Sequence, residues 1–439
     1  MKKTLIILLA LLLVGCNEET NIDDKQNYVF NFSDVETNEN YGETKMLILA
    51  DEDIYIDKAG VYELSGKLLG KIIIDVAQDV RLVLNNVDIY SHDDACIYAK
   101  NTNNLIITLK ENSINNLSDG SNYNSNDKDV DSVIYCNNNL IINGTGALNI
   151  NGNYKNAIVS KGDLTIYNPT INIVCPNKAI MGESSVKIKN SDISIDCASD
   201  GIRSKNEETG FIYLDNSSID IETKANAIKA YSLIQIESGF LNIIESKEGL
   251  EAKDITINNG DISIKASDDA INCSLQDAND KEIKNNKQLK EYYEKIERLE
   301  CLININGGSI HIDADGDGLD SNGSISINGG NVFIEGPTSG KDCGLDYVVR
   351  CESNGGSIFV SGMAEQIQEF SSSSKQYGVT YIFDKTYKKD SHVLIKNEEE
   401  VLFDYVVGKQ FDALQFSNEK MKKNEAITIT INDDIYELN

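Results

Sequence analysis

Apolar and polar residues alternate along the middle of the chain in a pattern that recurs about every 22 residues. Each copy reads apolar, variable, apolar, then four residues typical of turns, then apolar, variable, apolar. The copies are LTIYNPTINI from 164, VKIKNSDISI from 186, IYLDNSSIDI from 212, IQIESGFLNI from 234, ITINNGDISI from 255, ININGGSIHI from 303 and ISINGGNVFI from 325. Alternation with period two indicates strands, and a fixed repeat of roughly 20–50 residues indicates a solenoid.

Two short strands and a third apolar pair in each repeat predict one coil of a parallel β-helix, with the isoleucines of successive coils stacked inside. Leucine-rich repeats have a similar length, but the sequence lacks their Leu/Asn consensus and their helix. Coils should rise by about 4.8 Å, the distance between neighbouring strands. We therefore predict an all-β fold, a right-handed parallel β-helix of roughly 11 coils.

One interval of the repeat is longer than the others. The copies that start at 255 and 303 are 48 residues apart, and removing the stretch at about 275–300 restores the period. Its apolar residues at helical spacing are Leu289, Tyr293, Ile296 and Leu299. We predict a helical insertion there, within a β-helix that covers 46–364 and is followed by a C-terminal β cap at 365–439.

The first residues, MKKTLIILLALLLVGC, are two lysines and an apolar run too short to cross a bilayer, ending in the Leu-Val-Gly-Cys of a bacterial lipobox. We expect 1–15 to be a lipoprotein signal peptide that is removed. Cys16 would then carry a lipid that anchors the protein in the bacterial cell envelope, outside the cytoplasm. The polar, acidic residues 16–45 would form a tether. An ordinary signal peptide with an incidental cysteine is the alternative.

The charge of the chain limits its partners. Its 439 residues include 40 basic and 70 acidic ones, a formal net charge of −30. Loss of Lys2 and Lys3 with the signal leaves 38 basic against 70 acidic residues, or −32. This balance disfavours nucleic acid as a partner. An anionic polymer could bind such a surface only if cations bridge the two.

The nine cysteines give no sign of a zinc site, because none forms a CxxC pair. Besides Cys16 there are two suggestive pairs. Cys175 and Cys197 end equivalent strands 22 residues apart, which favours stacked thiols in the core over a disulfide. Cys273 and Cys301 flank the insertion, and a disulfide between them could close its base.

The sequence DADGDGLDSNGS, which begins at Asp313, starts like an EF-hand calcium loop, with Asp at positions 1, 3 and 5 and Gly at 6. Position 12, however, is Ser324, where that loop requires Glu. The flanking sequences SIHID and SISING alternate as strands do, whereas an EF-hand needs helices. The segment is therefore not an EF-hand.

Stacking gives a separate reason to consider calcium. A residue type repeated once per coil forms a column with a step of about 4.8 Å, and carboxylates at that distance repel unless they are protonated or bridged. A hard cation with oxygen ligands is a common solution. We predict Ca²⁺ bound by aspartates of adjacent coils, namely Asp313, Asp315, Asp317, Asp320, Asp268, Asp269, Asp342 and Asp346. The alternative is that acidic corners only keep the rod soluble.

Three lysines raise the question of catalysis. Lys161, Lys205 and Lys253 each stand three residues after the anchoring apolar residue of a coil. Beside a calcium-bound uronate, Lys205 or Lys253 could act as the base of a β-elimination. Most surface lysines do no chemistry, and no GxSxG or Ser/His/Asp arrangement is visible. We therefore favour a protein without catalytic residues.

The segments AGVYELSGKLLGKIIIDVAQDVRLVLNNVDIYSHDDACIYAKNTNNLIITLKENSINNLSDG, INGTGALNINGNYKNAIVSKGDLTI and DGDGLDSNGSISINGGNVFIEGP resemble the bacterial family of carbohydrate-binding domain-containing proteins. The resemblance extends from about residue 50 to the closing segment FDYVVGKQFDALQFSNEKMKKNEAITITIND. It implies a calcium-bearing, right-handed parallel β-helix similar to pectate lyases, with polysaccharide binding as its activity. Asp200-Gly201 and Asp317-Gly318 keep the Asp-Gly pattern of the family, so the resemblance also implies Asp200 as a calcium ligand.

Together these features predict a surface-anchored lipoprotein that binds a polysaccharide, acidic in kind and held through calcium, without cleaving it. Its partners would be the polysaccharide and, through the lipid, a membrane. Two alternatives from other classes stay open at this point: a polysaccharide lyase of the pectate type, and a structural or adhesion rod with no glycan ligand.

Overall fold

A computed structural model describes residues 28, 30–32, 43–124, 127–274, 301–398 and 400–438. Asn31–Asn439 form one compact unit. The expected signal peptide, Cys16 and the expected helical insertion at about 275–300 lie outside the described residues, and so does most of the expected tether. No helix in the described ranges is long and apolar enough to span a bilayer.

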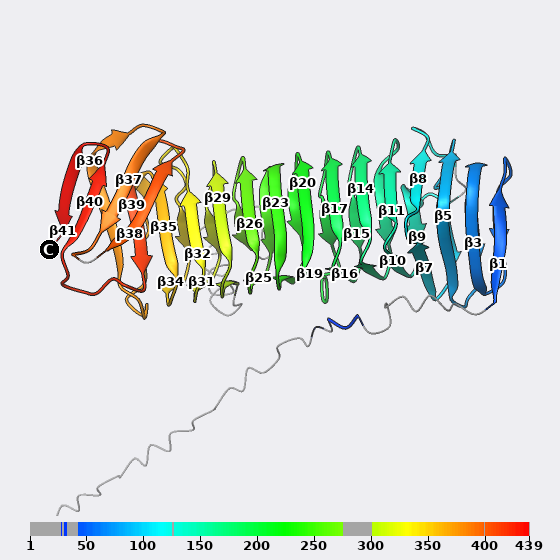
Figure 1. Ribbon diagram of the computed structural model, residues 1–439, viewed down its shortest axis with the longest axis horizontal. Coiled ribbons are helices and arrows are strands. Elements are labelled where there is room, and N and C mark those ends of the chain that lie inside the picture. The colour runs from blue at the N-terminus through cyan, green and yellow to red at the C-terminus, as the bar shows by residue number, and fades with distance from the viewer. Residues whose placement is uncertain are drawn as a thin grey trace, which may run out of the picture. The chain divides into compact units, whose positions relative to one another are not determined.

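Coils stack in a row from β1 to β35, and an antiparallel segment follows them (Figure 1). Each coil contributes one strand to sheet B, a parallel sheet of 12 strands. Its strands in order are β2 (Ile54–Ile56), β4 (Ile72–Asp75), β6 (Ile97–Asn101), β9 (Ser132–Cys136), β12 (Asn156–Ser160), β15 (Ile180–Gly182), β18 (Ile202–Ser204), β21 (Asn226–Lys229), β24 (Glu248–Ala252), β27 (Ile271–Cys273), β30 (Leu319–Ser321) and β33 (Leu345–Tyr347).

The other strands of the coils form a second, larger sheet with two stacks. The first stack is β1 (Thr44–Leu49), β3 (Gly60–Leu69), β5 (Val80–Ser91), β7 (Asn104–Leu109), β10 (Asn139–Gly144), β13 (Asp163–Tyr167), β16 (Ser185–Lys189), β19 (Phe211–Asp215), β22 (Leu233–Ile236), β25 (Asp254–Ile257), β28 (Leu302–Ile305), β31 (Ser324–Ile327) and β34 (Arg350–Ser353). The second continues from β3 and β5 through β8 (Ile114–Asp119), β11 (Ala147–Asn151), β14 (Thr170–Cys175), β17 (Asp192–Cys197), β20 (Ser217–Thr223), β23 (Gly239–Ser246), β26 (Asp261–Ala266), β29 (Ser309–Ala314), β32 (Asn331–Glu335) and β35 (Ser357–Gly362).

The predicted parallel β-helix is confirmed, with twelve coils where the sequence suggested about eleven. The predicted range, 46–364, contains all twelve strands of sheet B. Neighbouring coils pair in register, as Ile158 with Ile180 and Ile180 with Ile202 show. All three side chains are fully buried. The apolar positions of the repeat therefore stack into one continuous core, as the period predicted.

The corner between the two stacks of the larger sheet requires a left-handed backbone. In the early coils the corner residue is an asparagine, with φ of 75° at Asn168, 54° at Asn190 and 46° at Asn216. From Gly239 onward a glycine with positive φ takes the next position of the same turn, since Gly239 lies opposite Ser217. Asparagine tolerates this conformation better than other residues with a Cβ, and glycine adopts it without strain.

The eight cysteines that the structure describes are all buried and free. Cys175 and Cys197 lie directly opposite each other on β14 and β17, which agrees with stacked thiols. Cys273 and Cys301 are also free in the structure. Burial raises the pKa of the Cys301 thiol to about 12, so this group is protonated at neutral pH.

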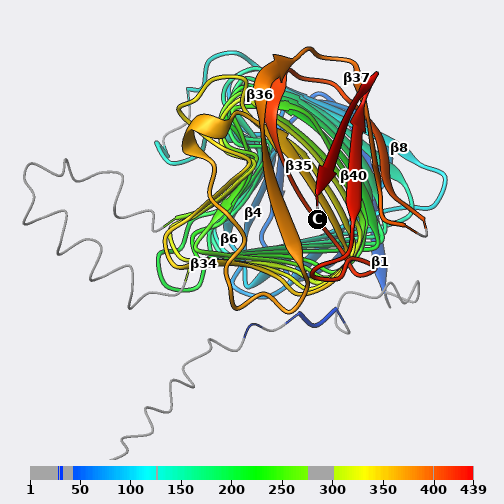
Figure 2. The same cartoon turned by 90° about the vertical axis from the view of Figure 1, so that its left-hand side faces the viewer.

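The two ends of the row of coils differ. After the single turn of 3₁₀ helix η1 (Ala364–Gln366), an antiparallel cap covers the C-terminal end, with strands β36 (Gly378–Tyr387), β37 (Ser391–Lys396), β38 (Val401–Val407), β39 (Phe411–Asn418), β40 (Ile427–Ile431) and β41 (Asp434–Leu438). In Figure 2, which faces this end, cap strands lie in front of the coils. β39 pairs antiparallel with β35, and the cap has its own aromatic core.

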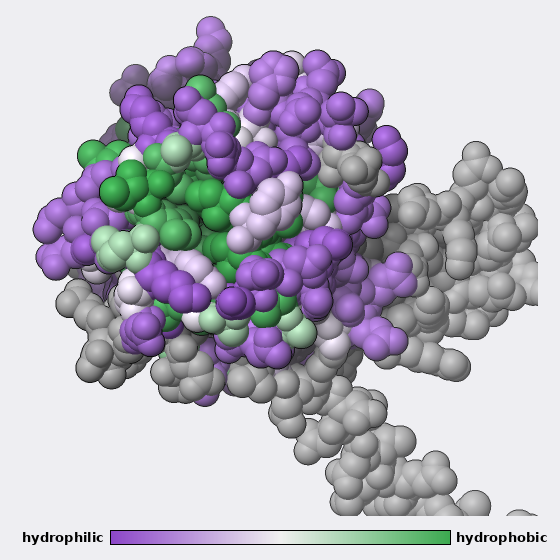
Figure 3. Space-filling view, turned by 90° about the vertical axis from the view of Figure 1, so that its right-hand side faces the viewer, coloured by the Kyte–Doolittle hydropathy of each residue, from purple (hydrophilic) through white to green (hydrophobic). Residues whose placement is uncertain are grey.

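At the other end, β1 pairs with β3 and β2 pairs with β4. No described segment pairs with the outer edge of either strand. Met46, Ile48 and Tyr55 on these strands are 62%, 86% and 69% exposed. Figure 3, which faces this end, shows apolar side chains gathered at its centre within a hydrophilic rim.

Candidate functional site

The outward side chains at the centre of the sheet B strands form one column, which we call the outer column. Register places one residue of each coil in it. From the first coil to the last, the column consists of Tyr55, Ile73, Tyr98, Tyr135, Val159, Met181, Arg203, Lys229, Glu251, Asn272, Asp320 and Asp346. Its first six members are apolar or aromatic and its last six are polar, so the face changes chemistry halfway along.

Part of the apolar stretch is covered by the chain itself. Tyr98, Tyr135, Val159 and Met181, which we call the covered stretch, pack in a cluster with Val130 from the segment that follows β8. Within that segment, Tyr123 packs against the same cluster. The Tyr98 hydroxyl donates a hydrogen bond of 2.6 Å to Asp127, which also belongs to the segment. This part of sheet B is therefore a second small core rather than an open surface.

The polar stretch begins with compensated charges. Beside the outer column runs a corner column, whose members stand three residues earlier in each coil: Asp200, Asn226, Glu248, Asp269 and Asp317. Arg203 binds Asp200 at 2.9 Å, and Lys229 forms an ion pair with the buried Glu251. Asn226 donates hydrogen bonds to Glu248 (3.0 Å) and Glu251 (2.5 Å). In these coils each buried charge has a partner close by.

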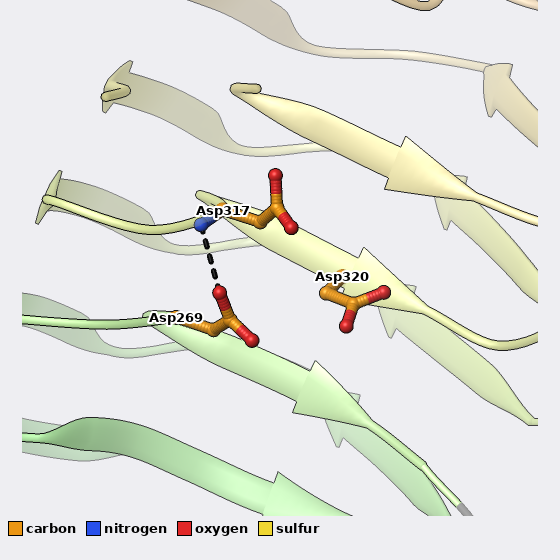
Figure 4. A group of neighbouring side chains, drawn as sticks. All are labelled: Asp269, Asp317 and Asp320. Carbon is orange, nitrogen blue, oxygen red and sulfur yellow. Dashed lines mark hydrogen bonds between the residues drawn. The ribbon is translucent and has the colours of Figure 1, made fainter. Parts of the chain in front are cut away.

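The next coils bring three carboxylates together without such a partner. Oxygen atoms of Asp269, Asp317 and Asp320, which we call the acidic triad, all lie within 4.8 Å of one another (Figure 4). Asp269 stands at the corner before β27, Asp317 at the corner before β30, and Asp320 at the centre of β30. No lysine or arginine among the described residues forms an ion pair with any of them.

Backbone contacts hold two members of the triad in place. The Asp317 N–H donates to Asp269 Oδ1 at 2.8 Å, as Figure 4 shows, and the Cys343 N–H donates to Asp317 Oδ1 at 2.5 Å. Each corner carboxylate thus satisfies an N–H of the next coil. Gly318 follows because a Cβ there would lie 2.5 Å from the carbonyl oxygen of Gly344. In the Asp317-Gly318 pair, the aspartate accepts a hydrogen bond from the next coil and the glycine leaves room for the backbone of that coil.

The environment of the triad opposes ionisation. Burial, aided by neighbouring carboxylates, raises the pKa of Asp320 to about 8 and that of Asp317 to about 7. Burial and the nearby Asp268 and Asp342 raise the pKa of Asp269 to about 6. One coil earlier, burial and Glu251 raise the pKa of Glu248 to about 7. The four carboxyl groups form a region of excess negative charge that a cation would relieve.

A fourth oxygen at this place lacks a partner. Asn272 Nδ2 donates to Asp269 Oδ2 at 3.1 Å. Its Oδ1 is buried and accepts no hydrogen bond from any described residue. Buried polar atoms are nearly always paired, so an orphan calls for a ligand or an ordered water. Three carboxylates form an all-oxygen donor set, which suits Ca²⁺ better than zinc or copper, and the residue with the unpaired oxygen, Asn272, lies opposite Asp320 on the neighbouring strand.

Three other predicted ligands, Asp268, Asp342 and Asp346, lie near the triad but outside it. Asp268 pairs with Lys247 at 3.1 Å. Asp346 lies opposite Asp320 on the next strand and accepts a hydrogen bond from Gln368. Asp342 acts on the triad through its charge. These three aspartates surround the site and could add to its negative field.

Asp313, Asp315 and Asp200 have other partners. Lys409 of the cap binds Asp313 at 2.6 Å and Asp315 at 3.0 Å. Asp200 is held by Arg203, as described above. The structure therefore uses the first two to join the cap to the coils and the third in a local ion pair.

The sequence interpretation did not single out Asn272 and Glu251 of the outer column or Glu248 of the corner column. The signal was present, because each stands at a fixed offset from the anchoring residue of its coil. Asn272 follows Ile271 just as Asp320 follows Leu319.

The lysines considered as bases have carboxylate partners outside the triad. Lys205 lies 3.7 Å from Glu183, which also lies 3.9 Å from Lys161. Lys253 lies 4.0 Å from Asp254. Lys247, which pairs with Asp268 and Glu248, acts on Asp269 of the triad through its charge.

Two known proteins are similar to this chain. A carbohydrate-binding domain-containing protein of Acetivibrio thermocellus is 30% identical over 133 residues, which make up 29% of this chain and 46% of that protein. The chain thus spans about half the length of this relative. A solved structure of a polysaccharide lyase-like protein from C. thermocellum, a gadolinium derivative, is 24% identical, with a TM-score of 0.41 over 50% of this chain and 92% of that one.

A family model provides the firmer assignment. The model described as carbohydrate-binding domain-containing protein matches residues 50–283. This range is more than half of the 439 residues, and it includes the covered stretch, the corner column up to Asp269 and the first strands of the polar stretch. The match confirms the family expected from the sequence motifs: the chain belongs to the carbohydrate-binding domain-containing protein family.

Proposed function

We propose that the protein binds an acidic polysaccharide on the polar stretch of sheet B, through a calcium ion held by Asp269, Asp317 and Asp320, and that it does not cleave the polymer. Membership of a carbohydrate-binding family supports the ligand class. The observation that carries the proposal is the acidic triad, three carboxylates within 4.8 Å of one another beside an unpaired buried amide oxygen.

Charge explains why a cation belongs in the proposal. A chain with a net charge of −30 repels an anionic polymer. Calcium would supply the positive charge that joins protein carboxylates to a uronate carboxylate, and its flexible shell accepts oxygens from both. Asp269 and Asp317 hold their side chains ready through the backbone contacts of adjacent coils. A preformed site of this kind lowers the ordering cost of binding.

The contacts of the lysines support binding without cleavage. A β-elimination needs a base within hydrogen-bond reach of the proton that it removes. Lys205 and Lys253 are held by Glu183 and Asp254. Lys247 is held by two carboxylates, which raise its pKa and keep it protonated. No observation therefore favours the lyase alternative, and we leave it as an outcome of the test.

The experiment compares binding of oligogalacturonate with calcium and with EDTA in two matched variants. Asp317→Asn keeps an oxygen acceptor for the Cys343 N–H but removes the charge. Asp313→Asn removes a charge of the same sequence motif that Lys409 already binds. Loss of a charged ligand should weaken calcium-dependent binding by about tenfold or more in Asp317→Asn. Asp313→Asn should change it less than twofold.

Equal binding in calcium and EDTA would refute the calcium part of the proposal. Steady release of unsaturated products, followed by their ultraviolet absorbance, would refute the absence of cleavage. If product release then stopped in Lys205→Ala or Lys253→Ala, the corresponding lysine would be the base.

We also propose, from the lipobox sequence alone, that Cys16 carries a lipid and holds the protein at the outer side of a bacterial membrane. Cys16→Ala should release the protein from the membrane fraction. Unchanged partitioning would exclude this anchor.

A further inference from the structure

A second aromatic site lies on the outer face of the larger sheet, away from sheet B. Tyr167 on β13 and Tyr213 on β19 point outward two coils apart, with β16 between them. Lys187 and Lys189 of β16 form the floor of the gap between the two tyrosines. We call these four residues the aromatic socket.

The chain itself fills the socket. The ring of Phe32 lies 5.9 Å from the ring of Tyr167 and 6.0 Å from that of Tyr213, measured between centroids. Lys189 Nζ lies 5.6 Å from the centre of the same ring. Phe32 is only 9% exposed, although the residues directly before and after it, Asn31 and Ser33, are polar. The socket therefore binds a six-membered ring contributed by a segment outside the coils.

The dimensions of the socket follow from the stacking of strands. Two steps of about 4.8 Å separate β13 from β19. Tyr167 lies opposite Lys189 and Tyr213 lies opposite Lys187, so the two tyrosines are also offset by two residues along the strands and the socket runs diagonally across β16. Its occupant tilts by 35° and 43° against the two tyrosine rings. A pyranose has a similar size and an apolar face that packs on aromatic rings.

The floor of the socket adds a charge preference. In a chain with a net charge of −30, two lysines stand on the strand between the two tyrosines, and Lys189 lies near the ring of Phe32. Lys189 is bound by Asp215 at 2.8 Å. Lys187 lies opposite Thr165 and Tyr213 on the neighbouring strands. A carboxylate on the ring would therefore have Lys187 as its partner, whereas the ring of phenylalanine carries no charge to pair with it.

We propose that the aromatic socket is a second glycan subsite that takes one hexuronate unit of a polysaccharide, and that Phe32 occupies it as an intramolecular competitor. The proposal rests on the proposed function for the class of ligand, but it does not rest on calcium. The sugar ring packs between Tyr167 and Tyr213, and its carboxylate pairs with Lys187. Binding requires Phe32 to leave, so the affinity is reduced by the fraction of molecules in which the socket is open.

The test measures binding of oligogalacturonate, and of a neutral oligogalactan of equal length, to the full chain in EDTA. The Asp317→Asn background removes any contribution from the acidic triad. Phe32→Ala should tighten oligogalacturonate binding by roughly three- to tenfold, because the competitor is gone. Phe240→Ala, which removes an aromatic ring that is 42% exposed elsewhere on the coils, should leave the affinity unchanged.

Two further variants in the Phe32→Ala protein examine the walls and the floor. Tyr213→Phe should keep the gain in affinity and Tyr213→Ala should abolish it, because only the first retains the ring. Lys187→Gln should weaken binding of oligogalacturonate and leave binding of the neutral oligomer unchanged. Circular dichroism and the melting temperature of each variant show that it is folded.

Unchanged affinity in Phe32→Ala together with a lower melting temperature would overturn the proposal, because Phe32 would then be a strap alone. Equal binding of the charged and neutral oligomers would overturn the hexuronate preference. Failure of the proposed function gives a different result: calcium would then have no effect in the parent protein, while the effect of Phe32→Ala in EDTA would persist.

Discussion

The covered stretch and the acidic triad lie on the same face of sheet B, yet the first is buried by another segment and the second carries unpaired carboxylates. Both stand on parallel strands that pair in register and on the same stack of buried aliphatic residues. In the covered stretch, Tyr98 and Tyr135 pack against the segment after β8, which covers this part of the sheet. In the triad, carboxylates repel one another and leave a demand for a cation. The side chain at one position per coil thus decides whether the face becomes core or site.

The largest effect should come from the covered stretch. Tyr135 is 1% exposed, and Tyr135→Ala should lower the free energy of unfolding by about 3–5 kcal/mol, because it leaves a cavity under the covering segment. Urea denaturation of the calcium-free protein measures this. Tyr135→Phe is the control. It should be neutral or slightly stabilising, since the buried hydroxyl has no partner among the described residues. A large cost for Tyr135→Phe would contradict this account of the hydroxyl.

The acidic triad should show the next largest effect, through its ligand. Calcium at about 100 times its dissociation constant should stabilise the folded protein by about 2.7 kcal/mol and raise the melting temperature. Asp317→Asn should remove most of this gain, whereas Asp313→Asn, whose partner is Lys409, should keep it. A melting temperature that is the same in calcium and EDTA would leave the triad as a set of solvated corners.

A smaller effect concerns pH without calcium. The pKa values of Asp269, Asp317 and Asp320 are raised by burial from the ordinary 3.8 to about 6, 7 and 8. Between 3.8 and these values the folded protein binds more protons than the unfolded chain, so stability falls as pH rises. In EDTA the melting temperature should be lower at pH 8.5 than at pH 5.5.

The matched control for the pH experiment is Asp320→Asn, which removes the group with the highest of these pKa values and should flatten the dependence most. If the wild-type melting temperature instead rose between pH 5.5 and 8.5 in EDTA, the three carboxyl groups would not be buried as the structure shows.

The smallest effect should come from the exposed ion pairs at the edge of the site. Lys247 pairs with Glu248 and Asp268, and its side chain is 55% exposed. Lys247→Gln should cost about 0–1 kcal/mol and should strengthen calcium binding, because it removes a competing positive charge. Lys67→Gln, which breaks a similar pair with Asp88 far from the triad, should leave calcium binding unchanged. Isothermal titration with calcium separates the two variants.

Much of the fold follows from the sequence because the repeat determines the length of each coil and the direction of its side chains. The spacing from Ile158 to Ile180 to Ile202 gives the length of a coil, and alternation gives the direction of each side chain. The number of coils was predicted only as roughly 11, because the aligned copies begin at Leu164 and the coils before that residue do not show the same sequence pattern. The interpretation could not see the covering of Tyr98 and Tyr135, since it depends on how the segment after β8 folds back.

Within the site, only contacts between residues of adjacent coils could be predicted from the sequence. Asp317 and Asp320 meet Asp269 because the repeat places them one coil apart, and the sequence interpretation joined these three for that reason. It also joined Asp313 and Asp315, which instead bind Lys409. That lysine is about 95 residues further along the chain, and its position is set by the docking of the cap. Spacing within a repeat carries no information about such a contact.

The unequal ends of the row of coils have a mechanical consequence. Coils in a solenoid contact only their neighbours, so a force applied through the N-terminal segment acts first on the contact of Phe32 with its socket and then on β1, whose outer edge no described strand covers. From there the coils can unfold one at a time, and each must unfold before the force acts on the next. The antiparallel cap holds the opposite end, so extension under load has a fixed direction, from the first coil toward the last.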